Sequence, residues 1–63
     1  MQIQVHNHGS VLGFTPLDQE ATDFLRYVHT EAWQWMGDTL WIDHRPARAF
    51  VAQACEEGVE FVD

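Results

Sequence analysis

The first residues of the chain alternate between apolar and polar side chains. Within residues 2–6, Ile3 and Val5 lie on one side, and glutamine or histidine lies on the other. This period of two is typical of a strand with one buried face. A turn-forming Asn-His-Gly-Ser segment and a second short apolar run, residues 11–14, follow. We therefore predict a β-hairpin over residues 2–14.

The next segment changes to a helical spacing. Apolar residues recur at intervals of three and four positions, which predicts an amphipathic helix. Thr15 is expected to cap its N-terminus, with Pro16 at the first helical position and Asp18 at the third. The helix is expected to end near His29 or Glu31. Its buried stripe is predicted to hold Leu17, Ala21, Phe24, Leu25, Val28 and Ala32.

A second hairpin is predicted after this helix. Trp33–Met36 and Thr39–Asp43 are rich in aromatic and alternating residues, and Gly37-Asp38 between them is suitable turn chemistry. Leu40 and Ile42 are expected to share the buried face of the second of these strands.

A second helix is predicted to open at Pro46 and to end before Gly58, which is the residue type most often found just past a helix. A last strand is predicted over Val59–Val62. The apolar stripe of this helix is predicted to be Ala47, Phe50, Val51, Ala54 and Cys55.

The predicted order is ββαββαβ in a single small domain over residues 1–63. We expect an α+β fold of two layers, with both helices packed on one face of a mostly antiparallel sheet. The other face would then be open, and Trp41 on it would either mark an interaction site or shield the sheet. By alternation this face is predicted to carry Gln2, Gln4, His6, Thr39, Trp41 and Asp43.

Charge narrows the classes of function. The chain has ten acidic residues, three arginines and no lysine, for a formal net charge of −7, yet 46% of it is apolar. Intrinsic disorder is disfavoured by the apolar content. A surface with so few cations is unsuited to binding nucleic acid or an anionic membrane directly. No membrane span or signal peptide is expected, and a single cysteine, Cys55, favours a reducing, cytoplasmic setting.

The acidic residues fall into groups. Glu20, Asp23 and Glu31 lie along one flank of the first predicted helix with Tyr27 among them, and Asp38 lies in the second hairpin turn. At most three acids can pair with arginines, so the others repel one another unless a basic partner relieves them. The alternative is that the charge serves solubility alone. A further group near the end of the sequence holds Glu56, Glu57, Glu60 and Asp63.

Catalytic and metal-binding motifs are weak. His6-Asn7-His8 places two imidazoles near each other, but a closed zinc site needs four ligands, so turn histidines are favoured over a metal site. Cys55 is expected to pack as a small apolar residue, and Ser10 has no adjacent base. We therefore predict a protein that is not an enzyme and has no cofactor or metal.

The stretch from Trp33 to Arg45, WQWMGDTLWIDHR, resembles part of a group of small phage and mobile-element proteins. In size, acidity and single-domain character the whole chain resembles phage-encoded anti-CRISPR proteins, especially those that act on type I systems. The resemblance implies a location in the bacterial host cell. It also implies a mechanism in which carboxylates stand where DNA would present phosphates, on the basic DNA-binding surface of a surveillance complex. In a type I-C complex this surface would belong to the large subunit of Cascade that reads the PAM.

The leading hypothesis is thus an acidic, DNA-mimicking inhibitor that blocks target recognition by a CRISPR effector. The alternative is a small phage assembly or regulatory module that binds protein through the open face of its sheet. The predicted partner-binding residues are Glu20, Asp23, Tyr27, Glu31, Asp38, Trp41, Glu56, Glu57 and Glu60.

Overall fold

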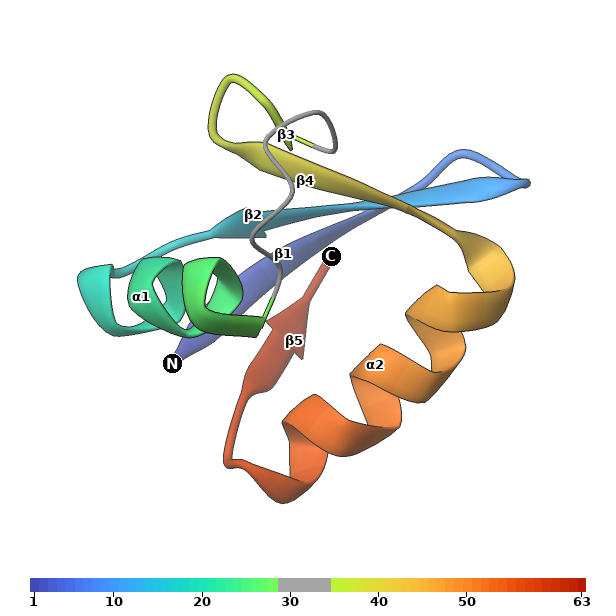
Figure 1. The fold of residues 1–63 in the computed structure, drawn as a ribbon. Coiled ribbons are helices and arrows are strands. Elements are labelled where there is room, and N and C mark those ends of the chain that lie inside the picture. The colour runs from blue at the N-terminus through green and yellow to red at the C-terminus, as the bar shows by residue number, and fades with distance from the viewer. Residues whose placement is uncertain (29–34) are drawn as a thin grey trace.

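The computed structural model describes residues 1–28 and 35–63. Within these residues it has five strands and two helices in the predicted order ββαββαβ (Figure 1). The elements are β1 (Gln2–Asn7), β2 (Val11–Pro16), α1 (Gln19–Val28), β3 (Trp35–Met36), β4 (Thr39–Asp43), α2 (His44–Glu56) and β5 (Glu60–Val62).

The strands form one mixed sheet in the order β3-β4-β2-β1-β5. All neighbouring pairs are antiparallel except β1 and β5, which run parallel because α2 carries the chain back to the starting edge. The predicted α+β class and the mostly antiparallel sheet are confirmed.

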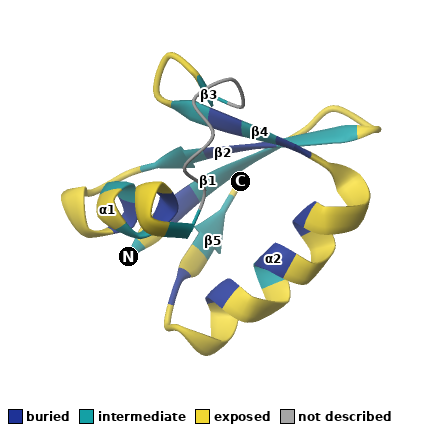
Figure 2. Cartoon of the chain, in the orientation of Figure 1, coloured by how far each residue is buried: buried dark blue, intermediate teal, exposed yellow. Residues whose placement is uncertain are grey.

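Both helices pack on the same face of the sheet, as predicted (Figure 1). The Phe50 ring of α2 lies 5.2 Å from the Phe14 ring of β2 and 6.2 Å from the Phe24 ring of α1, measured between centroids. Burial follows this arrangement: the dark segments in Figure 2 face the space between the helices and the sheet. The buried hydrophobic residues are Ile3, Phe14, Ala21, Leu25, Leu40, Ile42, Ala47, Phe50, Ala54 and Val59.

The first helix begins later than predicted. Thr15 and Pro16 belong to β2, since the antiparallel ladder with β1 continues as far as the pair Ile3–Pro16. Asp18 is the capping residue instead, because its Oδ1 accepts a 2.7 Å hydrogen bond from the backbone N–H of Ala21. Leu17 therefore lies outside the helix and is 48% exposed. The predictions that Thr15 is the cap and that Leu17 belongs to the buried stripe are wrong.

The second helix begins two residues before Pro46, with Asp43 at its N-cap position. Proline is tolerated there because the first turn has no intrahelical acceptor for its missing N–H. The end of α2 agrees with the prediction: Gly58 has φ +90°, and the N–H of Val59 reaches back 3.0 Å to the carbonyl of Ala54. This pattern is a Schellman motif.

Cys55 is exposed, so its predicted place in the buried stripe of α2 is wrong. The buried positions Ala47, Phe50 and Ala54 define the centre of the stripe. At 3.6 residues per turn, position 55 lies roughly 90° from that centre, on the flank of the helix.

Candidate functional site

Every carboxylate in the described part of the chain is exposed to solvent. These acids come from both helices, from β4 and β5 and from the segments beside them, and the described core contains no polar or charged residue. The charge therefore lies entirely on the surface of this part of the molecule. The nine residues are Asp18, Glu20, Asp23, Asp38, Asp43, Glu56, Glu57, Glu60 and Asp63.

The arginines in the described part of the chain form no ion pairs with these carboxylates. Among residues 1–28 and 35–63 no ion pair joins an arginine to an acid; the single ion pair recorded there joins the Met1 ammonium to Glu20 Oε1 at 3.8 Å. The guanidinium carbon of Arg26 instead lies 5.1 Å from the centre of the Trp35 ring, a cation–π contact. A basic partner would thus meet carboxylates that are not already paired with a described arginine.

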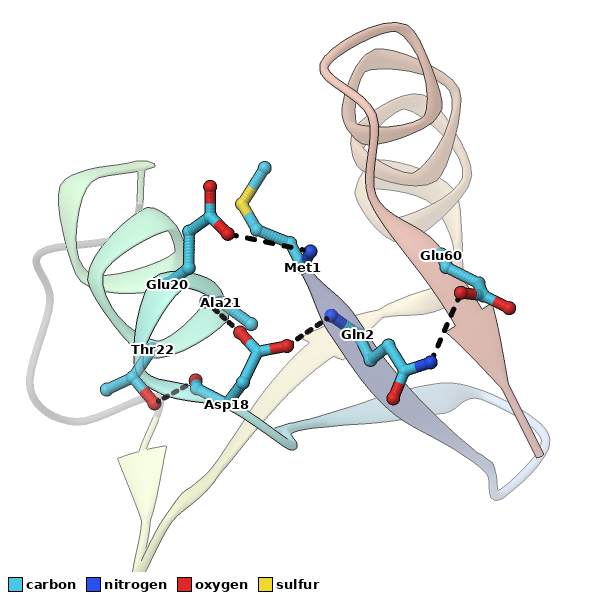
Figure 3. A network of polar contacts seen from close by, with 7 residues as sticks. All are labelled: Met1, Gln2, Asp18, Glu20, Ala21, Thr22 and Glu60. Atoms are coloured by element: carbon cyan, nitrogen blue, oxygen red, sulfur yellow. Dashed lines mark hydrogen bonds and ion pairs between the residues drawn. The ribbon is translucent and has the colours of Figure 1, made fainter.

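Acids that are far apart in the sequence meet around the start of β1 (Figure 3). Asp18 Oδ2 accepts a 2.9 Å hydrogen bond from the backbone N–H of Gln2, whose side-chain amide donates to Glu60 Oε1 at 3.2 Å. Glu20 reaches the ammonium of the neighbouring residue, Met1. We call Asp18, Glu20 and Glu60 the acidic end. It joins the acids of α1 to those that follow α2.

Asp18 contributes a negative charge to the acidic end and also stabilises its structure through hydrogen bonds. Hydrogen bonds from the backbone N–H groups of Ala21 and then Gln2 lower the pKa of its carboxyl group, because both donors favour the ionised form. The same side chain thus caps α1 and fastens it to β1.

Replacing Asp18 by asparagine tests this double role. Asparagine still caps a helix, so the variant should fold at neutral pH. A lowered folded-state pKa gives stability that is present above the ordinary carboxyl value of about 4 and is lost as the pH falls through the folded value. The wild-type melting temperature should therefore fall more than that of Asp18→Asn between pH 6 and pH 2, measured by circular dichroism. Asp23→Asn is the control, and an identical acid profile for all three proteins would contradict the assignment.

The predicted flank of α1 is exposed. Glu20 and Asp23 are both accessible, and Tyr27 on the next turn is 85% exposed. Asp23 Oδ1 accepts a hydrogen bond from the Gln19 side chain at 2.9 Å. The fourth member of the predicted set, Glu31, lies outside the described residues.

The remaining predicted acids do not all join the acidic end. Glu56 and Glu57 lie at the end of α2, and Gly58 and Val59 separate them from Glu60 of β5. Asp38 lies in the β3–β4 turn, and β3 and β5 are opposite edges of the sheet. Of the predicted set, Glu20 and Glu60 therefore meet at the start of β1, and Asp38 lies at the far edge of the sheet.

The open face of the sheet carries an aromatic and polar cluster. Trp41 of β4, Gly13 of β2 and His6 of β1 lie in one row across three strands. The Trp41 ring covers Gly13, because a Cβ placed there would meet its Cζ3 atom at 2.7 Å. The rings of His6 and His8 lie 6.4 and 5.1 Å from that of Trp41.

A short hydrogen-bonded chain lies beside this row. His6 Nε2 is 3.2 Å from Thr15 Oγ1, which is 2.6 Å from Thr39 Oγ1. Trp41 is thus partly buried as a cover over the sheet rather than projecting as a free anchor. Sequence reasoning missed Gly13 and Thr15. A glycine inside a strand was the available signal, since it often marks a close approach by another group.

The described residues that were considered for nucleophilic catalysis or metal binding do not have the arrangement that either role requires. His44 Nδ1 lies 3.4 Å from Ser10, but at the carbonyl oxygen and not at the hydroxyl, so the contact is not a nucleophile–base pair. An open hollow of about 350 Å³ beside it is lined by Ser10, Asp43, His44, Arg45 and Pro46. Within residues 1–28 and 35–63, no three His, Cys, Asp or Glu side chains are grouped to hold a metal ion.

Neither α1 nor α2 has the length and apolar character of a membrane-crossing helix. No protein-family model, curated protein or solved structure matches this chain.

Proposed function

We propose that this domain is an acidic, non-catalytic inhibitor that binds the basic, nucleic-acid-binding surface of another protein. The observation that carries the proposal is the state of the nine described carboxylates, which are all exposed and form no ion pair with a described arginine. Such groups keep their charge available for a cationic partner.

The acidic end gives this charge a location. Glu20 and Glu60 come from different elements and lie on either side of the start of β1 (Figure 3). Basic surfaces that bind DNA take most of their affinity from phosphate contacts, which carry no sequence information. Carboxylates at several points on one surface can occupy such contacts without imitating the bases.

The resemblance to anti-CRISPR proteins supplies the partner to be tested first. We propose a type I surveillance complex in the cytoplasm of a bacterial host, and within it the large subunit that reads the PAM. The domain would be encoded by a phage or mobile element, and DNA would be the competing ligand.

Removing carboxylates from the acidic end tests the proposal. Glu20→Gln together with Glu60→Gln should weaken binding to a purified type I-C complex about thirtyfold, as expected for losing two charge-assisted contacts of the order of 1 kcal/mol each. The affinity of the unmodified domain should also fall steeply between 50 and 200 mM salt. Surface plasmon resonance, with target DNA as a competitor, measures both.

The control changes the net charge equally at another place. Asp38→Asn with Asp43→Asn, both exposed and both at the β3–β4 side of the sheet, likewise removes two negative charges. If the two double variants lose affinity equally, only net charge matters and the acidic end is not the site. If neither loses affinity, the proposed function is wrong.

A second candidate is a protein-interaction module that uses the open face. The cluster of Trp41, His6 and the two threonines favours it, because an ordered aromatic and polar surface is common at interfaces. Under this alternative Trp41→Ala weakens binding more than the loss of any carboxylate, and salt has little effect.

A further inference from the structure

One edge of the sheet is open. In the strand order β3-β4-β2-β1-β5, β5 is the last strand, and within the described residues it pairs with β1 alone. An edge strand presents backbone N–H and C=O groups on its outer side, which can pair with a further strand. The outer side of β5 is therefore a site where an extended segment of another chain can add to the sheet.

The register shows which groups face outward. The N–H of Glu60 donates to the Met1 carbonyl at 2.9 Å, so the backbone groups of Glu60 face β1. Successive residues of a strand direct their N–H and C=O groups to opposite edges. The N–H and C=O of Phe61 consequently face away from β1.

The acidic residues around β5 determine which kind of strand is favoured at this edge. Four of the eight residues from 56 to 63 are acidic, and none is basic. Glu60 is exposed, and its side chain lies beside that of Gln2 on the open face. A strand added at this edge places a side chain about 5 Å from Glu60, where a lysine or arginine is favoured and an acid is disfavoured.

A second copy of the chain does not fit this edge. Two copies joined at β5 would bring Glu57, Glu60 and Asp63 of one chain close to the same acids of the other. Short edge strands with charged residues are a common means by which proteins prevent self-pairing. The same acidic residues attract a strand that carries lysine or arginine.

We propose that the outer edge of β5 binds an extended, basic segment of a partner protein by strand addition. This inference rests on the proposed function, because it takes the partner to be basic, and it specifies the binding mode. Backbone pairing at Phe61 provides the alignment, and Glu60 with its neighbouring acids provides the preference for lysine and arginine.

A single methyl group tests the proposal. The chain of 63 residues is accessible to chemical synthesis, and methylation of the Phe61 backbone nitrogen removes the outward donor and blocks the edge. The net charge and the Phe61 side chain, whose ring lies 6.0 Å from that of Phe14, are unchanged. The probe is a short peptide of alternating lysine and valine, with its lysine nitrogens methylated so that it pairs on one side only; in antiparallel pairing valine then lies opposite Phe61 and lysine lies beside Glu60.

The peptide should shift the backbone amide resonances of β5 in NMR spectra of the unmodified domain. The methyl group at Phe61 should weaken its binding about tenfold, as expected for a lost hydrogen bond and a blocked edge. The control is the same methyl group on the exposed Asp38 amide in the β3–β4 turn, which should have no effect. A peptide with the same residues in two blocks should bind weakly.

The outcomes separate this inference from the proposed function. If the Phe61-methylated domain binds the peptide and the surveillance complex as tightly as the unmodified domain, strand addition is wrong, while a salt-dependent interaction of the carboxylates still stands. If Glu20→Gln with Glu60→Gln leaves binding to the complex unchanged, the proposed function fails. Dimerisation of the domain through β5, seen by sedimentation, would overturn the proposed occupant.

Discussion

Replacing Phe14 by alanine is expected to unfold most of the protein at room temperature. Phe14 is fully buried in the central part of the sheet, and its ring contacts Phe50 of α2 and Phe61 of β5. Truncating such a side chain costs about 3–5 kcal/mol. A domain of 63 residues is stable by roughly 3–9 kcal/mol, at about 0.05–0.15 kcal/mol per residue, so this loss approaches the total. Urea unfolding followed by far-ultraviolet circular dichroism measures it.

Two other substitutions provide comparisons for the loss of stability in Phe14→Ala. Phe14→Leu keeps most of the buried volume and should lose much less stability. Met36→Ala removes a side chain that is 72% exposed and should change the free energy of unfolding by no more than about 0.5 kcal/mol. A Phe14→Ala variant with the unfolding midpoint of Met36→Ala would show that the core is not centred on Phe14.

Gly13→Ala is expected to destabilise the protein by about 1–2 kcal/mol, although alanine usually suits a strand better than glycine. The added Cβ would lie 2.7 and 2.8 Å from Cζ3 and Cη2 of Trp41, closer than carbon atoms approach without strain. The indole ring must move off the sheet to make room. Urea unfolding again gives the free energy.

The sign of this effect should reverse when Trp41 is absent. In a Trp41→Ala background the ring atoms that the added Cβ would meet are gone, and Gly13→Ala should then be neutral or stabilising by about 0.5 kcal/mol, because it restricts the unfolded chain. The double-mutant cycle isolates the contact between the two positions. Equal destabilisation in both backgrounds would mean that the backbone, not the tryptophan ring, requires glycine there.

The pattern of the sequence predicted the elements well where local rules decide them. Alternation placed Ile3, Leu40 and Ile42 on the buried face, and Gly58 marked the end of α2 because only a residue tolerant of positive φ continues comfortably from that cap. These outcomes depend on neighbouring residues alone.

Local rules failed where distant segments compete. Thr15 and Pro16 form a good helix start on their own, but pairing with β1 draws them into β2 and leaves the cap to Asp18. The parallel pairing of β1 with β5 also lies beyond local patterns, since it joins Gln2 to Glu60 across 58 positions.

The arrangement of the candidate site also could not be predicted from local sequence patterns. The sequence identified Glu20 and Glu60 as members of two acidic groups, but it could not show that these two residues meet at the start of β1. It equally could not show that Asp38 lies at the opposite edge of the sheet. Net charge can be counted from composition, whereas the division of that charge between surfaces is decided by strand order.

The parallel pairing of the first and last strands has a consequence for how the protein is made. When residues 2–43 have left the ribosome, β1, β2 and β4 can pair, but the outer side of β1 has no neighbour until Glu60–Val62 emerge. The buried residues Ala47, Phe50, Ala54 and Val59 are also added late. The nascent chain therefore exposes an apolar sheet face and an unpaired strand until Glu60–Val62 have emerged, and the fold can close only after β5 has been synthesised.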